Sequence, residues 1–264
     1  MALTELRHGN AIELQLSLYP ERRDQVSVWV LEGVIVDSGG QHTAPELVAW
    51  LRGKLPDAVL LGHHHEDHAA GAALLARHGV PVYGSRGTAY RLRRPAPIPD
   101  YRALLWGQRE PLAVRPVPDG APLQPVPLPG HSPDQLGYLD ARTGWLFSGD
   151  LVLRRRQQIA MRDEDPAAMM ASLRHAVEMR PEALATSHRS LIRPAAPALR
   201  ESLLYLEELA GGVRALRARG LTITAIVREL FGGEPVVAPG GLTWKQMSHG
   251  EFSAANWVRS FLRR

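Results

Sequence analysis

The stretch that decides the fold is Ala58-Val59-Leu60-Leu61-Gly62-His63-His64-His65-Glu66-Asp67-His68-Ala69-Ala70-Gly71. An apolar run of strand length ends at Gly62, and four histidines and two carboxylates then fall within six positions. Imidazole nitrogens and carboxylate oxygens are common ligands of zinc, iron and manganese, and burying them together without a cation would leave strong polar groups unpaired. A purification tag would lie at a terminus and lack Glu66 and Asp67, and a solvated loop need not follow a buried strand. We therefore expect a metal site.

The composition is that of a folded globular protein. The chain has 264 residues, 45% hydrophobic and 22% charged, which is enough for one large domain or two small ones with a sizeable core. It contains no cysteine, so disulfides, thiolate ligands and a cysteine nucleophile are excluded. Any bound metal must use His, Asp and Glu.

No apolar run is long enough to span a bilayer. Residues 1–13 contain Glu5, Arg7 and His8 where a signal peptide would need an apolar segment, so we expect a cytoplasmic protein without a membrane partner.

The net charge is +4, and arginines cluster at 86–94 and 154–156. An anionic substrate or a nucleic acid would suit such clusters, but acidic residues are interspersed elsewhere, which favours a solvated face.

Hydrophobic periodicity predicts a mixed α/β chain with helices concentrated at its end. At the start, Ile12, Leu14, Leu16 and Leu18 alternate with Glu13, Gln15, Ser17 and Tyr19, the pattern of a half-buried strand. We expect further strands at 26–30, 33–37, 58–61, 80–83, 113–117, 124–128, 138–139, 145–147 and 183–186, with a turn at 21–24. One helix is expected to be capped by Thr43, and further helices are expected at 69–78, 166–179, 197–219, 222–231 and 253–262. A loop is expected at 232–241.

The segment 85–130 is rich in proline, which forbids long regular elements there. We interpret it as an insertion that lines one side of a pocket.

Five motifs in order resemble those of the metallo-β-lactamase fold hydrolases. Residues 63–68 fit H-x-H-x-D-H, the hallmark of that family. Asp37 follows a strand, as in the first motif. The third, fourth and fifth motifs are matched by Pro129-Gly130-His131-Ser132-Pro133, Phe147-Ser148-Gly149-Asp150 and His188.

This resemblance implies an αββα four-layer sandwich with a helical C-terminal extension. We expect a catalytic domain over 1–193 and a helical module over 194–264. Two divalent metal ions, zinc first and iron or manganese as alternatives, would lie at one edge of the sandwich. Asp37 would hydrogen-bond into the metal loop, while His64 and Glu66 occupy variable positions. The implied ligands are His63, His65 and His131 for one metal, Asp67, His68 and His188 for the second, and Asp150 bridging both.

Two divalent cations lower the pKa of a shared water, so that hydroxide exists near neutral pH, and Asp67 can orient this nucleophile. The absence of cysteine excludes the commonest true β-lactamases, and the carboxylate at Asp150 instead resembles glyoxalase II, lactonases and RNase Z. We therefore predict a dinuclear metallohydrolase of an ester, thioester or lactone.

Two other functions remain open. A phosphodiesterase acting on RNA could use the same site, with Arg91, Arg93 and Arg94 contacting phosphates. A non-hydrolytic iron protein is disfavoured, because such relatives do not use a complete second site.

The expected partner is a small molecule, and Leu203, Leu206 and Trp257 could serve an oligomer interface as well as a core.

Overall fold

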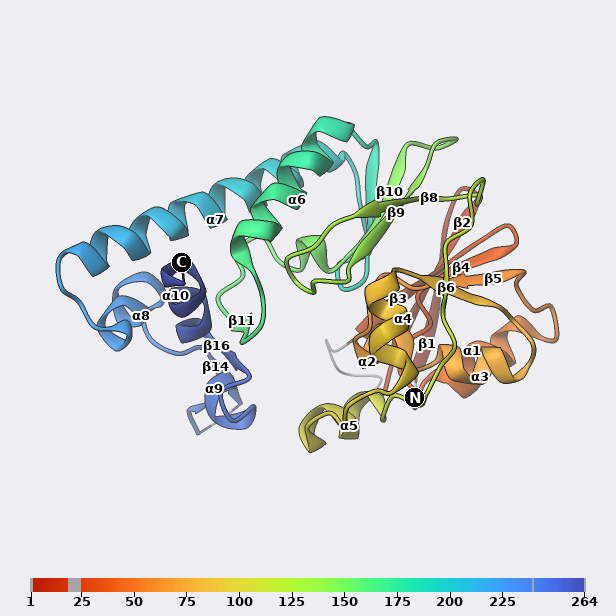
Figure 1. Cartoon of the computed structure of the whole chain (residues 1–264), viewed down its shortest axis with the longest axis horizontal. Coiled ribbons are helices and arrows are strands. Elements are labelled where there is room, and N and C mark those ends of the chain that lie inside the picture. Colours follow the sequence, from red (N-terminus) through yellow and green to blue (C-terminus); the bar gives the residue numbers. More distant parts are fainter. Residues whose placement is uncertain (1, 19–24, 239, 264) are drawn as a thin grey trace. The chain divides into compact units, whose positions relative to one another are not determined.

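The computed structural model describes residues 2–18, 25–238 and 240–263. The chain forms two compact units, which Figure 1 shows coloured along the sequence. The first contains Met1–Pro127, Asp134–Asp150 and Glu182–Arg193, and the second contains Leu128–Pro133, Leu151–Pro181 and Pro194–Arg264. The catalytic domain expected over 1–193 and the module expected over 194–264 stay predictions.

A seven-stranded sheet forms one half of the first unit. Its first four strands pair antiparallel and the later ones parallel. The parallel strands are joined by crossovers that contain helices α1 (Ala44–Leu51), α2 (Glu66–Ala69), α3 (Ala72–Arg77), α4 (Arg86–Arg93) and α5 (Asp100–Trp106). The strand order is β1 (Ala2–His8), β2 (Ala11–Ser17), β3 (Gln25–Leu31), β4 (Val34–Val36), β5 (Ala58–Leu60), β6 (Val82–Gly84) and β7 (Arg115–Pro116).

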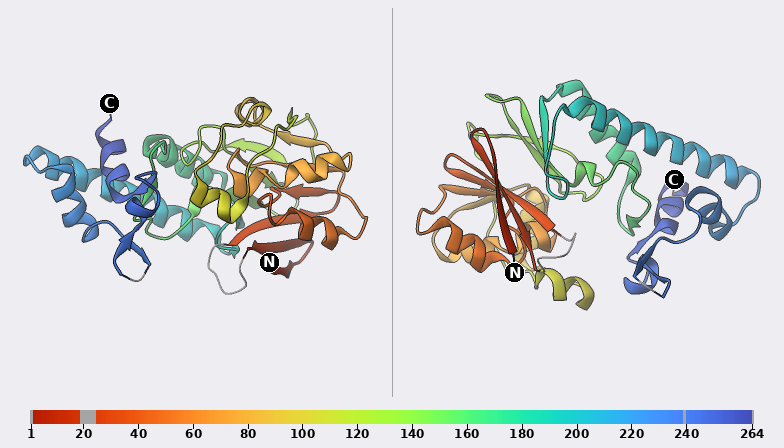
Figure 2. Two further views of the ribbon diagram at one scale, coloured as in Figure 1. Left: turned by 90° about the horizontal axis from the view of Figure 1, so that it is seen from below. Right: turned by 180° about the vertical axis from the view of Figure 1, so that it is seen from behind.

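A five-stranded sheet forms the other half, with strand order β13 (Leu191–Ile192), β12 (Ala183–Thr186), β10 (Trp145–Gly149), β9 (Leu136–Asp140) and β8 (Gln124–Pro127). The two sheets face each other (Figure 2). Trp29 and Leu60 from one sheet pack in a single buried cluster with Tyr138, Phe147 and Ala185 from the other. The apolar area removed from water between the sheets is the main source of their stability.

A helical layer covers the outer face of the seven-stranded sheet, where α1 and α3 lie (Figure 1). Leu47 of α1 and Leu75 of α3 are buried against Leu14, Ile35 and Val59 of the sheet. Leu14, Ile35 and Val59 are each 0% exposed, so β2, β4 and β5 are covered by a helical layer on this face and by the second sheet on the other.

The second unit is mainly helical. Its helices α6 (Pro166–Met179) and α7 (Ala195–Ala218) lie side by side in both figures. Leu206 and Trp257 are buried and Leu203 is partly buried. The remaining elements are β11 (Ala160–Met161) paired with β16 (Phe252–Ser253), β14 (Val236–Ala238) paired with β15 (Leu242–Thr243), α8 (Ile223–Phe231), α9 (Trp244–Met247), α10 (Ala254–Leu262) and a 3-10 turn at Asp150–Val152 that begins in the first unit.

The predicted α/β class, with facing sheets and C-terminal helices, is confirmed. In the part of the chain that the structure describes, no helix combines the length and apolar character needed to cross a bilayer.

Several local predictions are corrected. The strand 12–18 is not simply half-buried, because Glu13 is fully buried and Ser17 is 8% exposed. The helix expected over 69–78 is two helices, separated at Ala70–Gly71. The proline-rich segment contains α4 and α5, and the expected loop at 232–241 contains β14. Tyr19 and the expected turn at 21–24 lie outside the described residues.

Candidate metal centre

The metal loop begins where β5 ends. Leu60 and Leu61 are buried, and the Leu61 N–H donates to the Tyr83 carbonyl at 2.8 Å. His63 to His65 follow as a short irregular segment, and α2 begins at Glu66. Because successive strand residues point to opposite faces, leaving the strand before the first histidine frees several consecutive side chains to point toward one place.

Asp37 orients this loop from the neighbouring strand end. Its Oδ1 accepts the Gly62 N–H at 2.7 Å, and its Oδ2 lies 2.8 Å from Nδ1 of His68. The predicted hydrogen bonding of Asp37 into the metal loop is therefore confirmed. Asp37 has a φ of 61°, in the left-handed region, where Asp and Asn are more common than other side chains but still strained. With one imidazole nitrogen held by Asp37, His68 presents Nε2 to the centre.

Gly71 allows α2 to pack closely against the chain after Asp37. A Cβ at Gly71 would lie 2.1 Å from the Ser38 carbonyl oxygen. The Ser38 N–H and hydroxyl both donate to the His68 carbonyl, at 2.8 and 2.7 Å. These contacts fix the helix that carries Asp67 and His68 relative to β4.

Within the first unit, predicted ligand side chains form two groups of potential metal ligands. In each group the donor atoms lie within 4.8 Å of one another. The groups are His63, His68 and Asp150, and Asp67, His68 and His188. His65 follows in the same loop, and His131 belongs to the second unit, in its segment Leu128–Pro133.

Within the first unit, two carboxylates and two imidazoles face one another. Oδ1 of Asp150 lies 3.3 Å from Nε2 of His68 and 3.5 Å from Nε2 of His188. Oδ2 of Asp67 lies 3.6 and 3.4 Å from the same two nitrogens. Ligands about 2.1 Å from a tetrahedral ion are separated by about 3.4 Å. The separations between these four side chains therefore match those of ligands around one metal ion better than those of direct hydrogen bonds.

The Nε2 atom of His68 supports the same interpretation. It is buried and makes no hydrogen bond with any residue that the structure describes. A buried polar atom without such a partner needs an explanation, and an ion is a common one. The donor set and this atom together fit a divalent cation.

The carboxylates shift the proton equilibria of both histidines. Burial alone would lower the pKa of His188, but Asp150 and Asp67 outweigh it and raise that pKa to about 10. Burial likewise opposes the charged form of His68, yet Asp150, Asp67 and Asp37 raise its pKa well above the usual value. Burial would raise the pKa of Asp67, but His68 and His188 lower it. The carboxylates thus create a strong preference for positive charge at this point.

The outlying histidines are also oriented through their second ring nitrogen. Nδ1 of His188 lies 2.7 Å from the Gln25 carbonyl oxygen, which leaves Nε2 toward the carboxylates. Nδ1 of His131 lies 2.9 Å from Oε1 of Glu164. Burial raises the pKa of Glu164, and His131 opposes that rise.

The structure assigns different partners to the two variable positions of the loop. Nδ1 of His64 lies 2.8 Å from the buried Asp134, whose carboxylate also accepts the His64 N–H at 3.0 Å. Both oxygens of Glu66 accept from Arg102, at 2.5 and 2.6 Å. Neither residue belongs to the donor groups of the first unit.

Sequence reasoning missed Asp134, Glu164, Arg102 and Glu13 as partners of the loop and its surroundings. Each reaches its contact through tertiary packing rather than a local motif. The one available signal is Glu13, the only acidic residue in the strand Ala11–Ser17.

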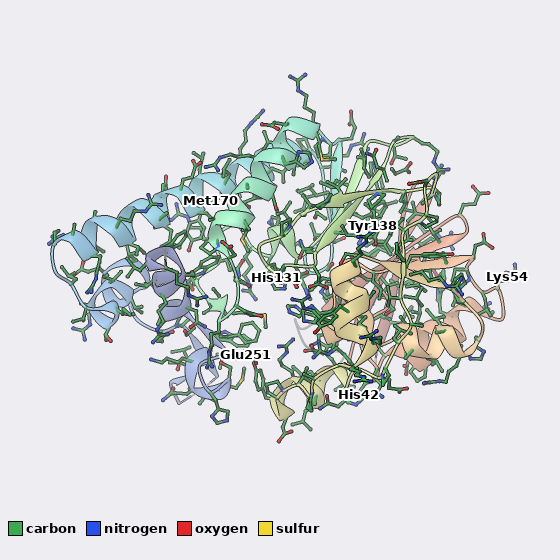
Figure 3. The ribbon with its side chains drawn as sticks, in the orientation of Figure 1. His42, Lys54, His131, Tyr138, Met170 and Glu251 are labelled. Carbon is green, nitrogen blue, oxygen red and sulfur yellow. The ribbon has the colours of Figure 1, made fainter. Side chains whose placement is uncertain are left out.

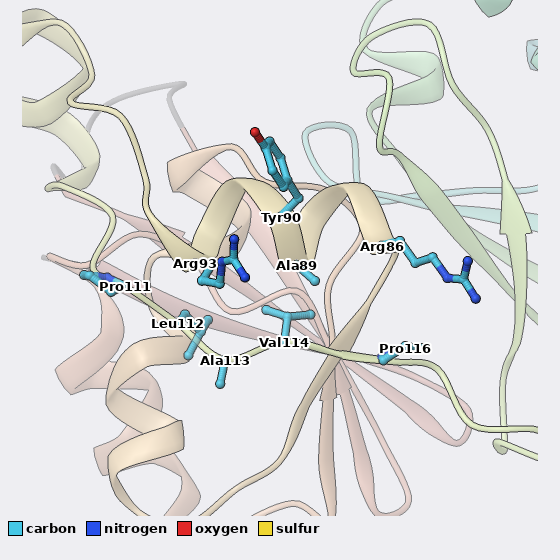
Figure 4. A pocket seen from close by; sticks show the side chains of 9 residues that line it. All are labelled: Arg86, Ala89, Tyr90, Arg93, Pro111, Leu112, Ala113, Val114 and Pro116. Atoms are coloured by element: carbon cyan, nitrogen blue, oxygen red, sulfur yellow. The ribbon is translucent and has the colours of Figure 1, made fainter.

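A separate groove of about 600 Å³ lies between α4 and residues 111–116. Leu112 and Val114 lie beneath the helix, with Arg86 toward one end and Arg93 toward the other (Figure 4). None of its lining residues belongs to the donor groups. Arg91, a candidate for phosphate contact, donates to the Gly87 carbonyl at 3.4 Å and lies 3.9 Å from Asp134.

The interior between the sheets also supports the loop. The hydroxyl of Tyr138, labelled in Figure 3, donates to the Leu61 carbonyl at 2.8 Å. Burial raises the pKa of Tyr138 well above its usual value, so this hydroxyl stays a donor.

The chain is similar in sequence or fold to several known proteins. A hydroxyacylglutathione hydrolase from Yersinia enterocolitica is 31% identical over 168 residues, which cover 61% of this chain. A beta-lactamase domain protein from Burkholderia ambifaria has a TM-score of 0.72 at 19% identity, covering 98% of this chain and 88% of its own. The protein TTHA1623, solved in a di-iron-bound form, has a TM-score of 0.56 at 28% identity, covering 70% of this chain and 96% of its own.

The chain spans less than two thirds of the length of its curated relatives, 60% in the case of the Yersinia enterocolitica enzyme. The family model of the metallo-beta-lactamase superfamily matches residues 22–188 of the chain. The match reaches from the start of β3 to the turn that carries His188. With the facing sheets and the grouped His and Asp donors, this match shows that the chain belongs to the metallo-beta-lactamase superfamily.

Proposed function

We propose that this chain is a dinuclear metal-dependent hydrolase that cleaves a thioester. The observation that carries the proposal is the position of Asp150. Its Oδ1 lies within 3.5 Å of Nε2 of both His68 and His188 and within the donor group that contains His63. A single carboxylate placed among donors from several motifs suits a bridge between two ions.

The proposed ligand sets combine the five motifs of the sequence with the two donor groups of the first unit. His63, His65 and His131 would hold one ion, while Asp67, His68 and His188 would hold the other. Asp150 would bridge them. The Nδ1 atoms of His68, His188 and His131 each lie at hydrogen-bond distance from a protein oxygen, as with Asp37 beside His68. Such partners are usual around the histidines that bind metal ions.

When bound, two divalent cations would supply a hydroxide near neutral pH and polarise the substrate carbonyl. Asp67 would accept a hydrogen bond from the nucleophile and aim it at the carbonyl carbon. A C–O bond would form there, the C–S bond would break, and the products would be a carboxylate and a thiol. No Ser or Cys nucleophile is needed.

The thioester is preferred over an ester or a lactone because of the similarity to a hydroxyacylglutathione hydrolase. A thiol is also a good leaving group, so the reaction needs no strong general acid beside the sulfur. We propose zinc as the first metal, since His and Asp donors suit it. Iron is the second, because TTHA1623 at 28% identity is described in a di-iron-bound form and such sites accept both ions.

The test is a side-by-side substrate panel on zinc-loaded and iron-loaded protein. It would contain an acyl-glutathione thioester, a p-nitrophenyl ester, an acyl-homoserine lactone, nitrocefin and a single-stranded RNA. Asp150→Ala should abolish most turnover, while Asp119→Ala, which alters an exposed carboxylate, should leave it unchanged. Thioester turnover that depends on Asp150 supports the proposal. RNA cleavage without thioester turnover would replace it with a phosphodiesterase.

A further inference from the structure

Glu13 is a buried carboxylate on β2 that none of the motifs includes. Its side chain is 0% exposed, in a strand whose neighbours Leu14 and Leu16 are apolar and buried. Removing an ionised carboxylate from water is costly unless several donors replace the lost solvent. The position therefore calls for a structural reason.

Four donors surround this carboxylate. Oε1 accepts from the Ser27 hydroxyl at 2.6 Å and from Nε2 of Gln15 at 3.0 Å. Oε2 lies 3.0 Å from Nε2 of His8 and accepts a short hydrogen bond from the Ser190 hydroxyl. Three of these donors belong to β1, β2 and β3. Ser190 belongs to the turn that carries His188.

This turn, residues 186–190, is closed on itself. The Thr186 N–H and hydroxyl donate to the Ser190 carbonyl at 3.2 and 3.0 Å, and the Arg189 N–H donates to the Thr186 hydroxyl at 2.9 Å. Ser190 has a φ of 61°, a strained conformation for a serine that surrounding contacts must maintain. The turn is thus rigid within itself, and its place depends on what holds it.

The turn is held on the inner face of β2 and β3. The Ser27 N–H donates to the Ser187 carbonyl at 2.7 Å, and Nε1 of Trp29 donates to the Thr186 carbonyl at 3.1 Å. Those two bonds fix the start of the turn. Glu13 provides the contact at its far end, beyond His188, through Ser190.

We propose that Glu13 is a positioning residue for His188. By accepting the Ser190 hydrogen bond it fixes the end of the turn, and so the place of the His188 imidazole between Asp67 and Asp150. Glu13 would thereby set the affinity with which the site containing His188 binds its metal ion. The inference rests on the proposed function insofar as His188 is a ligand.

Zinc titration of the metal-free full chain, in competition with a chromophoric chelator, tests the inference without any substrate. Ser190→Ala removes only the link between the carboxylate and the turn, and Glu13→Gln keeps the shape while removing the charge. Gln15→Ala is the matched control, because it removes another donor to the same carboxylate but leaves Ser190 bound.

We expect the wild-type chain to bind two zinc ions. Ser190→Ala and Glu13→Gln should each bind one of them about 10- to 100-fold more weakly, the usual effect of losing an outer partner of a metal ligand, while Gln15→Ala should bind both as the wild type does. Thermal melts of the metal-free proteins show whether each variant folds. If Glu13→Gln does not fold, the zinc affinity of Ser190→Ala carries the test.

If folded Ser190→Ala binds both zinc ions with wild-type affinity, the inference about Glu13 is overturned, while the proposed function is not. Equal weakening in Gln15→Ala and Ser190→Ala would also overturn it, because the effect would then be general to the strand. Wild-type protein that binds fewer than two ions would contradict the proposed dinuclear site itself, and the two failures are therefore distinguishable.

Discussion

Three consecutive histidines in the metal loop have different surroundings. Nε2 of His63 lies 2.9 Å from Nδ1 of His65, and both residues are proposed ligands of one ion. The side chain of His64 lies instead against Asp134. Identical side chains one residue apart thus have different expected roles, ligand or support.

Alanine substitutions should separate these roles. His65→Ala should lose one tightly bound metal ion, because it removes a proposed ligand of that ion. His64→Ala should keep both ions but lower the free energy of unfolding by about 1–3 kcal/mol, since the buried Asp134 carboxylate loses a donor. Metal analysis and thermal melts of both variants provide the measurement. Loss of an ion in His64→Ala with full retention in His65→Ala would reverse the assignment.

The sequence was sufficient to select the candidate ligands, because the motifs that contain them are local. Their roles remain predictions. The supporting residues were not predictable, because Asp134 reaches His64 and Glu164 reaches His131 across 70 and 33 positions. No local pattern records such contacts.

Helix α5 is joined to the metal loop by a buried ion pair. The side chains of Arg102 and Glu66 are 11% and 1% exposed, and the pair links α5 to the first residue of α2. Burial raises the pKa of Glu66, and Arg102 opposes that rise. Arg102 therefore favours the charged carboxylate against the effect of burial, and the pair ties α5 to the metal loop.

Arg102→Ala should lower the free energy of unfolding by about 3–5 kcal/mol, because it leaves a buried carboxylate without its cation. Arg77→Ala is the matched control. It breaks the Arg77–Glu110 pair, whose side chains are 56% and 39% exposed, and such surface pairs contribute about 1 kcal/mol or less. Urea unfolding measures both. Equal effects would show that burial of the pair does not matter.

Gly71, between α2 and α3, lies in close contact with the backbone of Ser38. Gly71→Ala would place a Cβ 2.1 Å from the Ser38 carbonyl oxygen, so we expect a loss of about 1–3 kcal/mol or more from overpacking. Gly211→Ala is the control, because that position in α7 has no atom within 4 Å of an added Cβ. It should stabilise the chain by up to about 1 kcal/mol. Unchanged melting of Gly71→Ala would contradict the close approach.

Elements with strong local signals were predicted well. The predicted bounds of α6, 166–179, match the structure, and Thr222 caps α8 as expected, accepting the Ala225 N–H at 3.3 Å. The break at Gly71 and the burial of Glu13 were not predicted. Both arise from contacts with distant chain segments, which override helical and strand periodicity.

Across the whole molecule, the two facing sheets bring chain segments far apart in sequence to one centre. Asp67 follows β5, Asp150 follows β10 and His188 follows β12. Asp150 and His188 lie just beyond strand ends, and Asp67 lies in α2, which the loop after β5 leads into, so all three side chains are free of the sheet core. The fold thus supplies the rigid frame, and the turns supply the chemistry.

The stoichiometry of metal binding tests the central claim most directly. Purified wild-type chain and Asp150→Ala, loaded with zinc and passed through a desalting column, would be analysed by elemental mass spectrometry. We predict two ions per wild-type chain, and no more than one in Asp150→Ala because the bridging carboxylate is lost. Fewer than one ion per wild-type chain, or two retained by Asp150→Ala, would contradict a dinuclear site bridged by Asp150.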